Sequence, residues 1–231
     1  MVGQRILEWY DEANRREFPW RHTTEPFHIL VSEMLLHQTF ARKVVPVYRA
    51  LVERYPTPMH FSRARTKTVR EMIRPLGFLY RADRLKAIGK KLVDDFSGAV
   101  PRDERGLLSL PGVGPYTANA VRCFGFEEQV PIVDTNVLRV YRRAFSTAPH
   151  STGLGPDKAS VEVAKEALPE GRARAYNYAI LDFAALVCTH YNPGCASCPL
   201  LEACDYGQET FRSDAETLRA AEPKADYNPS S

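Results

Sequence analysis

The chain has 231 residues, of which 44% are hydrophobic and 26% are charged, and its formal net charge is +3. This length is enough for one large or two small domains whose core needs no disulfide staples. No apolar run approaches the roughly 18 residues of a membrane span, and the N-terminus lacks the apolar segment and cleavage site of a secretion signal. We therefore expect a cytoplasmic globular protein, and not a membrane-embedded or secreted one.

Apolar residues recur with helical spacing along most of the chain. They lie at i, i+3, i+4 and i+7 in several segments, and no convincing alternating strand is found. Breaks at Pro and Gly separate these segments into helices of moderate length. The clearest predicted helices cover residues 6–17, 27–39, 41–55, 81–96 and 176–188. The sequence therefore predicts an all-α fold, followed by a polar and poorly ordered tail at 207–231.

Basic residues are concentrated in the middle of the chain. Between Arg63 and Lys91 there are ten Lys or Arg residues and two acids, Glu71 and Asp83. A basic segment suits a polyanionic partner, although a run of charge is commonly just a solvated helix face. The charge distribution therefore favours nucleic-acid binding only in combination with other motifs.

A glycine-rich turn lies in "LPGVGPYTANAV", residues 110–121. Gly112 and Gly114 allow positive φ, and Pro115 fits the first turn of a helix, where its missing N–H has no cost. The N–H groups of such a turn and helix start bind an anion, and they grip phosphate without reading base sequence. The same residues also fit a plain connection between two helices, so the turn alone leaves both interpretations open.

Two carboxylates stand out because each lies in apolar sequence. Asp134 follows Pro131 just before a predicted helix, where a carboxylate is commonly only an N-cap. Glu33 interrupts the apolar run "ILVSEMLL", and Glu is almost never buried in such a helix unless it is paired or functional. Two carboxylates in apolar surroundings can have pKa values pushed apart, which provides one acid and one anion. A buried structural ion pair is the alternative.

Four of the five cysteines lie within residues 188–204, with the spacing C-x6-C-x2-C-x5-C. For a chain without a secretion signal, bound metal is a better interpretation than disulfides. Zinc ribbons usually bring together two C-x-x-C pairs, whereas only Cys195 and Cys198 have that spacing here. Four thiolates on one short segment favour a [4Fe–4S] cluster over zinc. Cys123 lies among apolar helical residues and is predicted to be a core thiol.

Together these motifs resemble the helix-hairpin-helix DNA glycosylases of the endonuclease III and MutY type. The hairpin, the loop that ends in "VDTNVLRVYRR" and the cysteine spacing occur in the family's order over residues 5–206. The resemblance implies that the hairpin grips DNA phosphate and that Asp134 is catalytic. It implies a [4Fe–4S] cluster held by the four clustered cysteines, Cys188, Cys195, Cys198 and Cys204.

The same resemblance predicts the domain organisation and the partner. A helical-barrel lobe with the hairpin is expected at residues 26–138, and an iron–sulfur lobe is expected from residues 1–25 and 139–206. Asp134 would then lie at the seam between the lobes, where a groove can admit a flipped nucleotide. The expected partner is double-stranded DNA with a mismatched or damaged base, bound by a monomer.

Tyr116 separates this chain from one branch of the family. Endonuclease III enzymes carry a Lys at the position of Tyr116 and use it as a nucleophile to form a Schiff base. A tyrosine cannot form that intermediate, so the resemblance implies hydrolysis of the glycosidic bond by water, which leaves an abasic site. Tyr116 is then expected to shape the floor of the catalytic pocket.

Two further branches resemble this chain: the MutY adenine glycosylases and the Mig-type thymine or uracil mismatch glycosylases. "FPWR" at 18–21, "SEMLLHQT" at 32–39 and Asn136 match motifs that both share in whole or part. MutY reads adenine with Gln or Glu where this chain has Tyr178, carries a large C-terminal domain, and has "GLGYY" where this chain has "LGFLY". "AVRCFGF" and "ILDFAALVC" look more like the Mig branch. The sequence therefore predicts removal of thymine or uracil opposite guanine.

The resemblance gives each candidate residue a role. Asp134 would stabilise positive charge on the sugar, and Glu33 would orient water or hydrogen-bond the departing base. Gln38 and the loop at 78–81 would fill the gap left by the flipped nucleotide and hold the opposing guanine. His37 and Tyr178 are expected to line the base pocket. The predicted DNA contacts are Gln38, Leu79, Arg81, Gly112, Gly114, Thr117 and Asn136.

Two other functions compete with this prediction. One is a MutY-like adenine glycosylase. The other is a helix-hairpin-helix module that binds DNA, holds a structural cluster and has no turnover. The presence of both Asp134 and Glu33 favours an enzyme over the second alternative.

Overall fold

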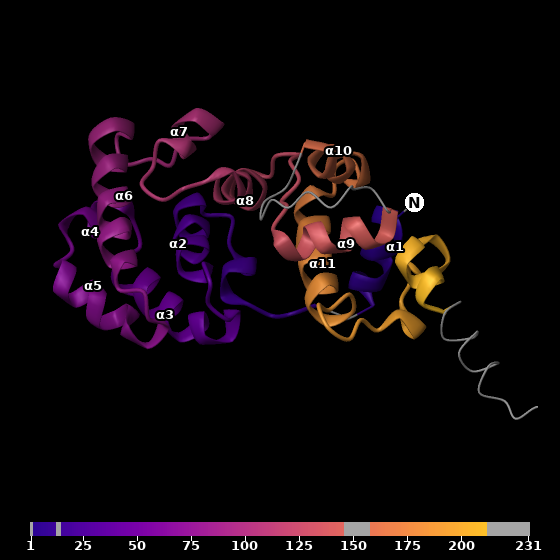
Figure 1. The fold of residues 1–231 in the computed structure, drawn as a ribbon. Helices are drawn as coiled ribbons and strands as arrows, with labels where there is room; N and C mark the ends of the chain where they lie inside the picture. The colour runs from indigo at the N-terminus through magenta and orange to yellow at the C-terminus, as the bar shows by residue number, and fades with distance from the viewer. Residues whose placement is uncertain (1, 13–14, 146–157, 212–231) are drawn as a thin grey trace, which may run out of the picture.

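A computed structural model describes residues 2–12, 15–145 and 158–211, and every regular element in these ranges is helical (Figure 1). The predicted all-α class is confirmed. No helix of the described residues is long and apolar enough to cross a membrane. The α-helices are α1 (Val2–Asp11), α2 (Pro26–Leu36), α3 (Ala41–Arg54), α4 (Pro58–Arg63), α5 (Thr66–Ile73), α6 (Tyr80–Phe96), α7 (Glu104–Leu108), α8 (Pro115–Phe126), α9 (Thr135–Phe145), α10 (Lys158–Ala167) and α11 (Ala173–Leu186).

The helices form two groups that the chain visits in turn (Figure 1). The chain begins with α1 in one group, crosses to the other group for α2–α8, and returns for α9–α11. Helix α1 packs against α11, so the first helix returns to the group formed by the later helices. One continuous cluster of buried apolar side chains extends through both groups. The groups are therefore two lobes around a shared core.

The predicted lobe boundary at residue 138 lies inside α9. Helix α9 packs against α10 and α11, and the connection between α8 and α9 covers residues 127–134. The tail also begins later than predicted, because residues 205–211 are helical, while 212–231 lie outside the described residues.

Helix α2 is the central helix of its lobe and packs against α3, α6 and α8. Residues 29–35 are all buried, and such an all-round apolar helix is stable only when other helices surround it. Pro26 starts the helix in its first turn. Because other helices surround α2, Glu33 near its C-terminal end is buried in the interior.

A buried ionic network attaches the segment after α1 to α11. Asp182, which is fully buried, accepts hydrogen bonds from Arg16 Nε at 2.5 Å and from both terminal nitrogens of Arg21 at 2.7 Å. The two guanidinium groups hold the pKa of the Asp182 carboxyl below its usual range, although burial opposes them. This segment, predicted to be helical up to residue 17, leaves α1 at Asp11. The network holds Arg21 over the ring of Tyr178, 4.6 Å from its centroid.

Candidate active site

The predicted hairpin is confirmed between α7 and α8. Gly112 has φ +78°, whereas Gly114 is extended with φ −103°, so positive φ is needed only at the first glycine. Pro115 occupies the first turn of α8 as expected. A Cβ on Gly114 would meet nothing within 4 Å. The backbone at the start of α8 is thus open to close approach by an anion.

Arg84 of α6 borders this turn, and the sequence argument did not single it out. Its side chain lies so close to Gly112 that a Cβ there would be 3.0 Å from Arg84 Cδ. The Arg84 guanidinium also lies over the ring of Tyr80, 4.6 Å from its centroid. An exposed cation beside the open turn adds positive charge where a phosphate would bind. In the sequence, Arg84 could have been identified as a candidate DNA contact from its place in the basic segment at 63–91.

Asp134 caps the N-terminus of α9. Its Oδ1 accepts hydrogen bonds from the N–H groups of Asn136 at 2.8 Å and Val137 at 2.7 Å. Its Oδ2 accepts from the Asn136 amide at 3.0 Å. The positive end of α9 favours a carboxylate here. The N-cap interpretation is therefore correct, and the cap also fixes the carboxylate beside Glu33.

Glu33 is buried, with 5% of the residue exposed. Burial and then the charge of Asp134 raise the pKa of Glu33 to about 8. Among the described residues no basic side chain forms an ion pair with Glu33, so the alternative of a buried structural ion pair is not supported. At neutral pH Glu33 carries a proton that it can donate.

Two tyrosines complete the cluster. Burial raises the pKa of Tyr116 well above its usual value, and the neighbouring Glu33, Asp134 and Tyr178 add to the rise. Burial likewise raises the pKa of Tyr178, with a smaller contribution from Glu33. The ring of Tyr178 stacks on Phe124 at 3.9 Å with an interplanar angle of 5°, and its hydroxyl is buried without a partner in the described part of the chain.

The four groups of this cluster come from both lobes. Glu33 lies on α2 and Tyr116 on α8, whereas Asp134 begins α9 and Tyr178 lies on α11. Electrostatic coupling among them places all four in one neighbourhood at the seam. The arrangement provides a protonated acid, a carboxylate and a free phenol donor within reach of one another, which is a set suited to general acid catalysis.

Two asparagines hold the connection that carries Asp134, and sequence reasoning missed both. The Asn177 side chain accepts from Ile132 N–H at 2.9 Å and donates to Val130 O at 3.0 Å. Asn119 donates to Pro131 O at 3.2 Å. The signal for Asn177 was an amide inside the apolar helical run "YNYAILDF", since such a buried amide needs partners.

The predicted DNA contacts divide into exposed and buried side chains. Gln38 and Asn136 are exposed, and Leu79 is 41% exposed beside Phe78 and Tyr80, which are also exposed. Arg81 is only 1% exposed and Thr117 only 2%. The side chains of Arg81 and Thr117 are therefore buried in this structure, and contact of these two residues with DNA stays a prediction.

The buried members bind protein groups instead. Thr117 Oγ1 lies 3.2 Å from His37 Nε2, and Arg81 donates to backbone carbonyls at the end of α2. Burial and the charges of Arg81 and Arg84 lower the pKa of His37, so its ring is neutral at neutral pH. His37 is half-buried and links the end of α2 to α8, at the edge of the cluster.

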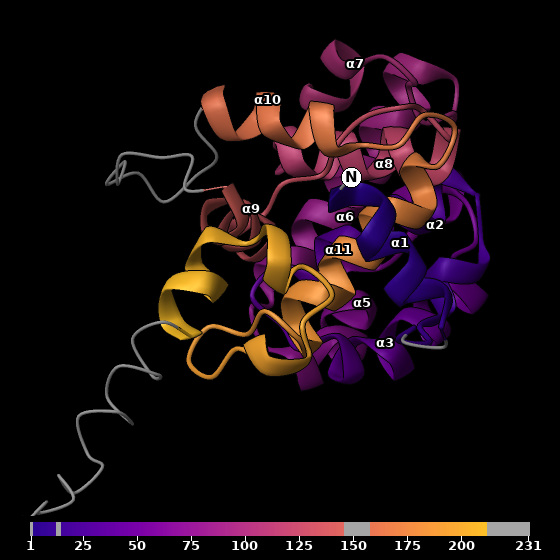
Figure 2. The same cartoon turned by 90° about the vertical axis from the view of Figure 1, so that its right-hand side faces the viewer.

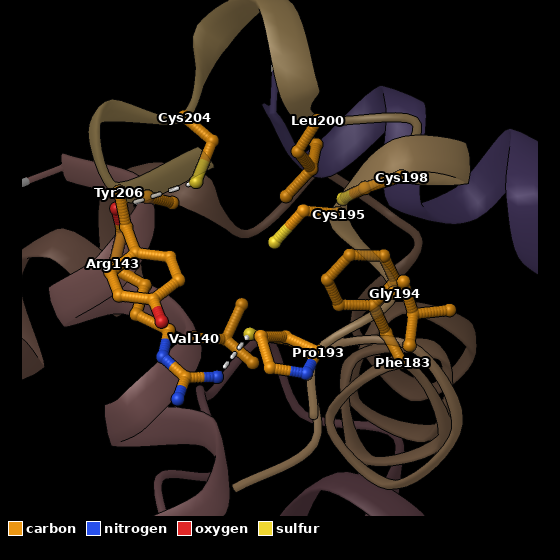
Figure 3. A pocket seen from close by; sticks show the side chains of 13 residues that line it. Val140, Arg143, Phe183, Pro193, Gly194, Cys195, Cys198, Leu200, Cys204 and Tyr206 are labelled. Atoms are coloured by element: carbon orange, nitrogen blue, oxygen red, sulfur yellow. Dashed lines mark hydrogen bonds between the residues drawn. The ribbon is translucent and has the colours of Figure 1, made fainter. Parts of the chain in front are cut away.

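The four clustered cysteines line one hollow between α9, α11 and the C-terminal turns (Figure 3). Figure 2 shows these turns beside α9 and α11. Figure 3 shows the sulfurs of Cys195 and Cys204 facing the space between the labelled side chains. The walls are apolar, with Val140, Phe183 and Leu200 among them. Arg143 donates to Cys188 Sγ at 3.4 Å. The fifth cysteine, Cys123, is fully buried as predicted.

The thiol arrangement can be tested against possible metals. In the described ranges, no three His, Cys, Asp or Glu side chains lie close enough to hold a single metal ion. A tetrahedral zinc site with Zn–S bonds of about 2.3 Å needs sulfurs within about 4 Å of one another. Four thiols and apolar walls form a sulfur-only donor set of the kind that an iron–sulfur cluster requires.

Known proteins with similar sequences are DNA repair proteins. Residues 31–164 match the profile of the HhH-GPD superfamily of base excision DNA repair proteins. A thymine/uracil-DNA glycosylase of Pyrobaculum aerophilum is 35% identical over 198 residues, which cover 84% of this chain and 86% of that protein. An adenine DNA glycosylase of Mycolicibacterium smegmatis is 39% identical over 196 residues, which cover 84% of this chain and 66% of that protein.

Solved structures are similar over nearly the whole chain. A thermostable thymine-DNA glycosylase superposes with a TM-score of 0.83 at 31% identity and covers 90% of this chain and 95% of its own. A non-covalent complex of endonuclease III with DNA superposes with a TM-score of 0.75 at 28% identity, over 92% of this chain and 99% of its own.

Proposed function

Since the chain belongs to the HhH-GPD superfamily of base excision DNA repair proteins, we propose that it is a DNA glycosylase that removes thymine or uracil mispaired with guanine. The observation that carries this proposal is the pair of carboxyl groups in one cluster, in which Asp134 and burial raise the pKa of Glu33. The names of the relatives, thymine/uracil-DNA glycosylase and adenine DNA glycosylase, support a glycosylase of DNA repair.

The mechanism uses the two carboxyl groups differently. The target nucleotide leaves the base stack, and a mismatch lowers the cost of this step. Protonated Glu33 donates to the departing base, which takes the electron pair of the glycosidic bond. The sugar becomes positively charged, and the Asp134 carboxylate stabilises that charge until water adds. The cap of α9 keeps this carboxylate in place, so no reorganisation is required during the reaction.

Tyr116 makes the enzyme monofunctional. An amine at this position could attack the sugar and form a Schiff base, whereas a phenol whose pKa is raised well above its usual value stays neutral and cannot. The product is then an intact strand with an abasic site. Tyr116 packs against the core close enough to Glu33 and Asp134 for their charges to raise its pKa.

Tyr178 supports a pyrimidine as the substrate base. Its ring is held between Phe124 and Arg21, and its buried hydroxyl has no hydrogen-bond partner among the described residues. A buried hydroxyl without a partner costs about 1–3 kcal/mol, which a carbonyl oxygen of thymine or uracil would offset. Adenine presents an amino donor where these bases have a carbonyl, so it fits this donor less well.

The proposal is tested by single-turnover cleavage of a duplex panel containing G·T, G·U, A·G and A·8-oxoguanine, with alkali used to reveal abasic sites. We expect G·U and G·T to be processed well ahead of both adenine duplexes, and uracil at least as fast as thymine. Adenine released faster than either pyrimidine would replace the proposal with the adenine function of the Mycolicibacterium relative.

We also propose that Cys188, Cys195, Cys198 and Cys204 hold a [4Fe–4S] cluster. The support is the hollow that all four thiols line and its apolar walls. Such a cluster would stabilise the C-terminal turns against α9 and α11. The thiols lie in the lobe of α9–α11, away from the hairpin on α7 and α8, so the proposed role is structural.

DNA is proposed to bind along the open hairpin and the exposed loops. The support is the unobstructed backbone at Gly114, the cation Arg84 beside Gly112 and the exposed Gln38 and Leu79. Phosphate contacts at the hairpin would position the duplex, while the two loops would act at the mismatch. Solved relatives include endonuclease III in complex with DNA.

A further inference from the structure

Arg81 has an unusual environment for a residue of a DNA-facing segment. Its side chain is almost completely buried at the start of α6. One terminal nitrogen donates to Leu35 O at 2.7 Å, and the other donates to His37 O and to Thr39 Oγ1, the latter at 2.9 Å. All three acceptors are uncharged and lie around Gln38. The buried guanidinium of Arg81 thus binds uncharged groups of one short segment, residues 35–39.

Arg81 also contacts the neighbouring loop. Its guanidinium lies over the ring of Phe78, 5.0 Å from the centroid. Phe78 has φ +49° and Gln38 has φ +53°, a left-handed conformation that residues other than glycine rarely adopt. The guanidinium therefore contacts one such residue, Phe78, and binds both chain neighbours of the other, Gln38. Backbone of this kind persists only where surrounding contacts hold it, and here Arg81 provides contacts to both loops.

The connection continues to the hairpin. His37, whose carbonyl accepts from Arg81, places its ring Nε2 3.2 Å from Thr117 Oγ1 in the first turn of α8. Helix α2 lies between α6 and α8, so its C-terminal end is the natural meeting point of the three segments (Figure 1). One chain of polar contacts thus joins the loop at 77–80, the loop at 37–40 and the helix that follows the hairpin.

We propose that Arg81 is a positioning residue that holds Gln38 and the exposed Phe78–Leu79 tip as one rigid wedge, so that both loops enter the duplex together at the mismatch. The inference rests on the proposed function, because it takes a damaged duplex as the ligand. Arg81 itself does not touch DNA. It restricts the conformations of the two loops before DNA binds. Less conformational entropy is therefore lost on binding.

The test measures binding and needs no turnover. The probe is a duplex with a tetrahydrofuran abasic analogue opposite guanine and a 2-aminopurine beside it, compared with the same duplex carrying an intact G·C pair. We expect Arg81→Met to reduce the preference for the abasic duplex by about tenfold and to lose the 2-aminopurine signal of wedge insertion. Affinity for the intact duplex should stay within about twofold, because Arg81 makes no phosphate contact.

Two further variants separate positioning from stability. Thr39→Ala removes one acceptor of Arg81 and leaves the buried cation its backbone partners, so it should fold and show a smaller loss in the same direction. Arg70→Met is the matched control, since Arg70 is exposed on α5 and pairs only with Asp83 at 2.8 Å. It should behave as wild type. In the wild-type background, Gln38→Ala should clearly reduce the preference for the abasic duplex. In the Arg81→Met background, the same substitution should reduce it by a further factor of less than about two.

The outcomes distinguish this inference from the proposed function. If Arg81→Met and Thr39→Ala change only the melting temperature and keep the wild-type preference and 2-aminopurine signal, the positioning role is wrong. Additive effects of Gln38→Ala and Arg81→Met would also overturn it. A wild-type protein that prefers the abasic duplex but excises neither thymine nor uracil would instead contradict the proposed function and leave the wedge intact.

Discussion

The side-chain oxygen of Asn177 on α11 accepts a hydrogen bond from the backbone N–H of Ile132 at 2.9 Å, two residues before Asp134. The amide nitrogen of Asn177 donates to Val130 O and to Ala173 O, both at 3.0 Å. One buried side chain therefore fixes the connection that places the Asp134 carboxylate at the seam between the lobes. The position of Asp134 depends on α11 as well as on its own helix.

Replacing Asn177 with Leu should impair stability and rate together. The change leaves Ile132 N–H and Val130 O without partners in the interior, and each unsatisfied group costs about 1–3 kcal/mol. We expect a loss of about 2–4 kcal/mol in the free energy of unfolding, measured by denaturant titration, and a slower single-turnover rate. Gln4→Leu, at an exposed amide on α1, is the control and should change neither. A fully active and stable Asn177→Leu protein would contradict the role of Asn177.

Replacing Asp134 with Asn should abolish turnover without unfolding α9. Asn is as good an N-cap as Asp, so Asn136 and Val137 keep an acceptor. Two unit charges about 4 Å apart at an effective dielectric constant of about 20 interact by about 4 kcal/mol, which corresponds to roughly a thousandfold in rate. Single-turnover assays should show this loss with DNA affinity retained. Near-normal excision would place the catalytic carboxylate elsewhere.

The glycosylase rate should fall as the pH rises through about 8. Only protonated Glu33 can donate to the departing base, and its pKa of about 8 means that the active form dominates at neutral pH and is lost above that value. Glu33→Gln should lower the single-turnover rate by about 10²–10⁴-fold and remove this limb of the pH profile. A wild-type rate that stays flat between pH 7 and 9.5 would show that Glu33 is not the acid.

The same carboxyl group should make stability depend on pH in a defined direction. Because its pKa in the folded protein is raised from 4.5 to about 8, the folded state holds a proton that the unfolded state releases between these values. Stability from this group is present below pH 4.5 and is lost as the pH rises towards 8. Glu33→Gln should therefore be more stable than wild type by about 3–5 kcal/mol at pH 9 and nearly equal at pH 4.5. Thermal unfolding at the two pH values checks this.

Tyr116 should prevent covalent trapping on DNA. Borohydride captures a Schiff base, and a neutral phenol forms none, so the wild-type protein should give little cross-linked complex and strand breaks only after alkali. Tyr116→Lys introduces an amine beside Glu33 and Asp134 and should increase trapping. Tyr116→Phe serves as the control and should remain untrapped. Efficient trapping of the wild-type protein would refute the monofunctional assignment.

Removal of one thiol should remove the metal. Purified protein is expected to be brown and to contain iron, and Cys198→Ser should lose both and unfold at lower temperature. Cys123→Ala is the matched control, because Cys123 is buried far along the chain from the clustered cysteines and contacts Asn177. Iron analysis and the visible spectrum provide the measurement. A colourless, active protein with one zinc ion would disprove the cluster.

The fold class and most helices were predictable because helical periodicity is a local property. The spacing of apolar residues predicted α2, α3, α6 and α11 to within a few residues, and Gly112 with Pro115 marked the hairpin by steric rules alone. The predicted lobe boundary at 138 lies inside α9, because periodicity shows where a helix is but not which neighbours it packs against. The first helix was overextended for the same reason, since Arg16 is held by Asp182, a distant residue.

The sequence by itself determined which residue types can do chemistry here: two carboxylates in apolar surroundings, a tyrosine in place of a lysine, and four closely spaced cysteines. Only the tertiary structure decided how they are used. Burial raises the pKa of Glu33, the cap of α9 orients Asp134, and Arg81 and Thr117 are buried although the sequence predicted DNA contacts for them. The physical reason is that a pKa, a hydrogen bond and an exposed surface each depend on neighbours from distant parts of the chain, whereas spacing along the sequence records only local geometry.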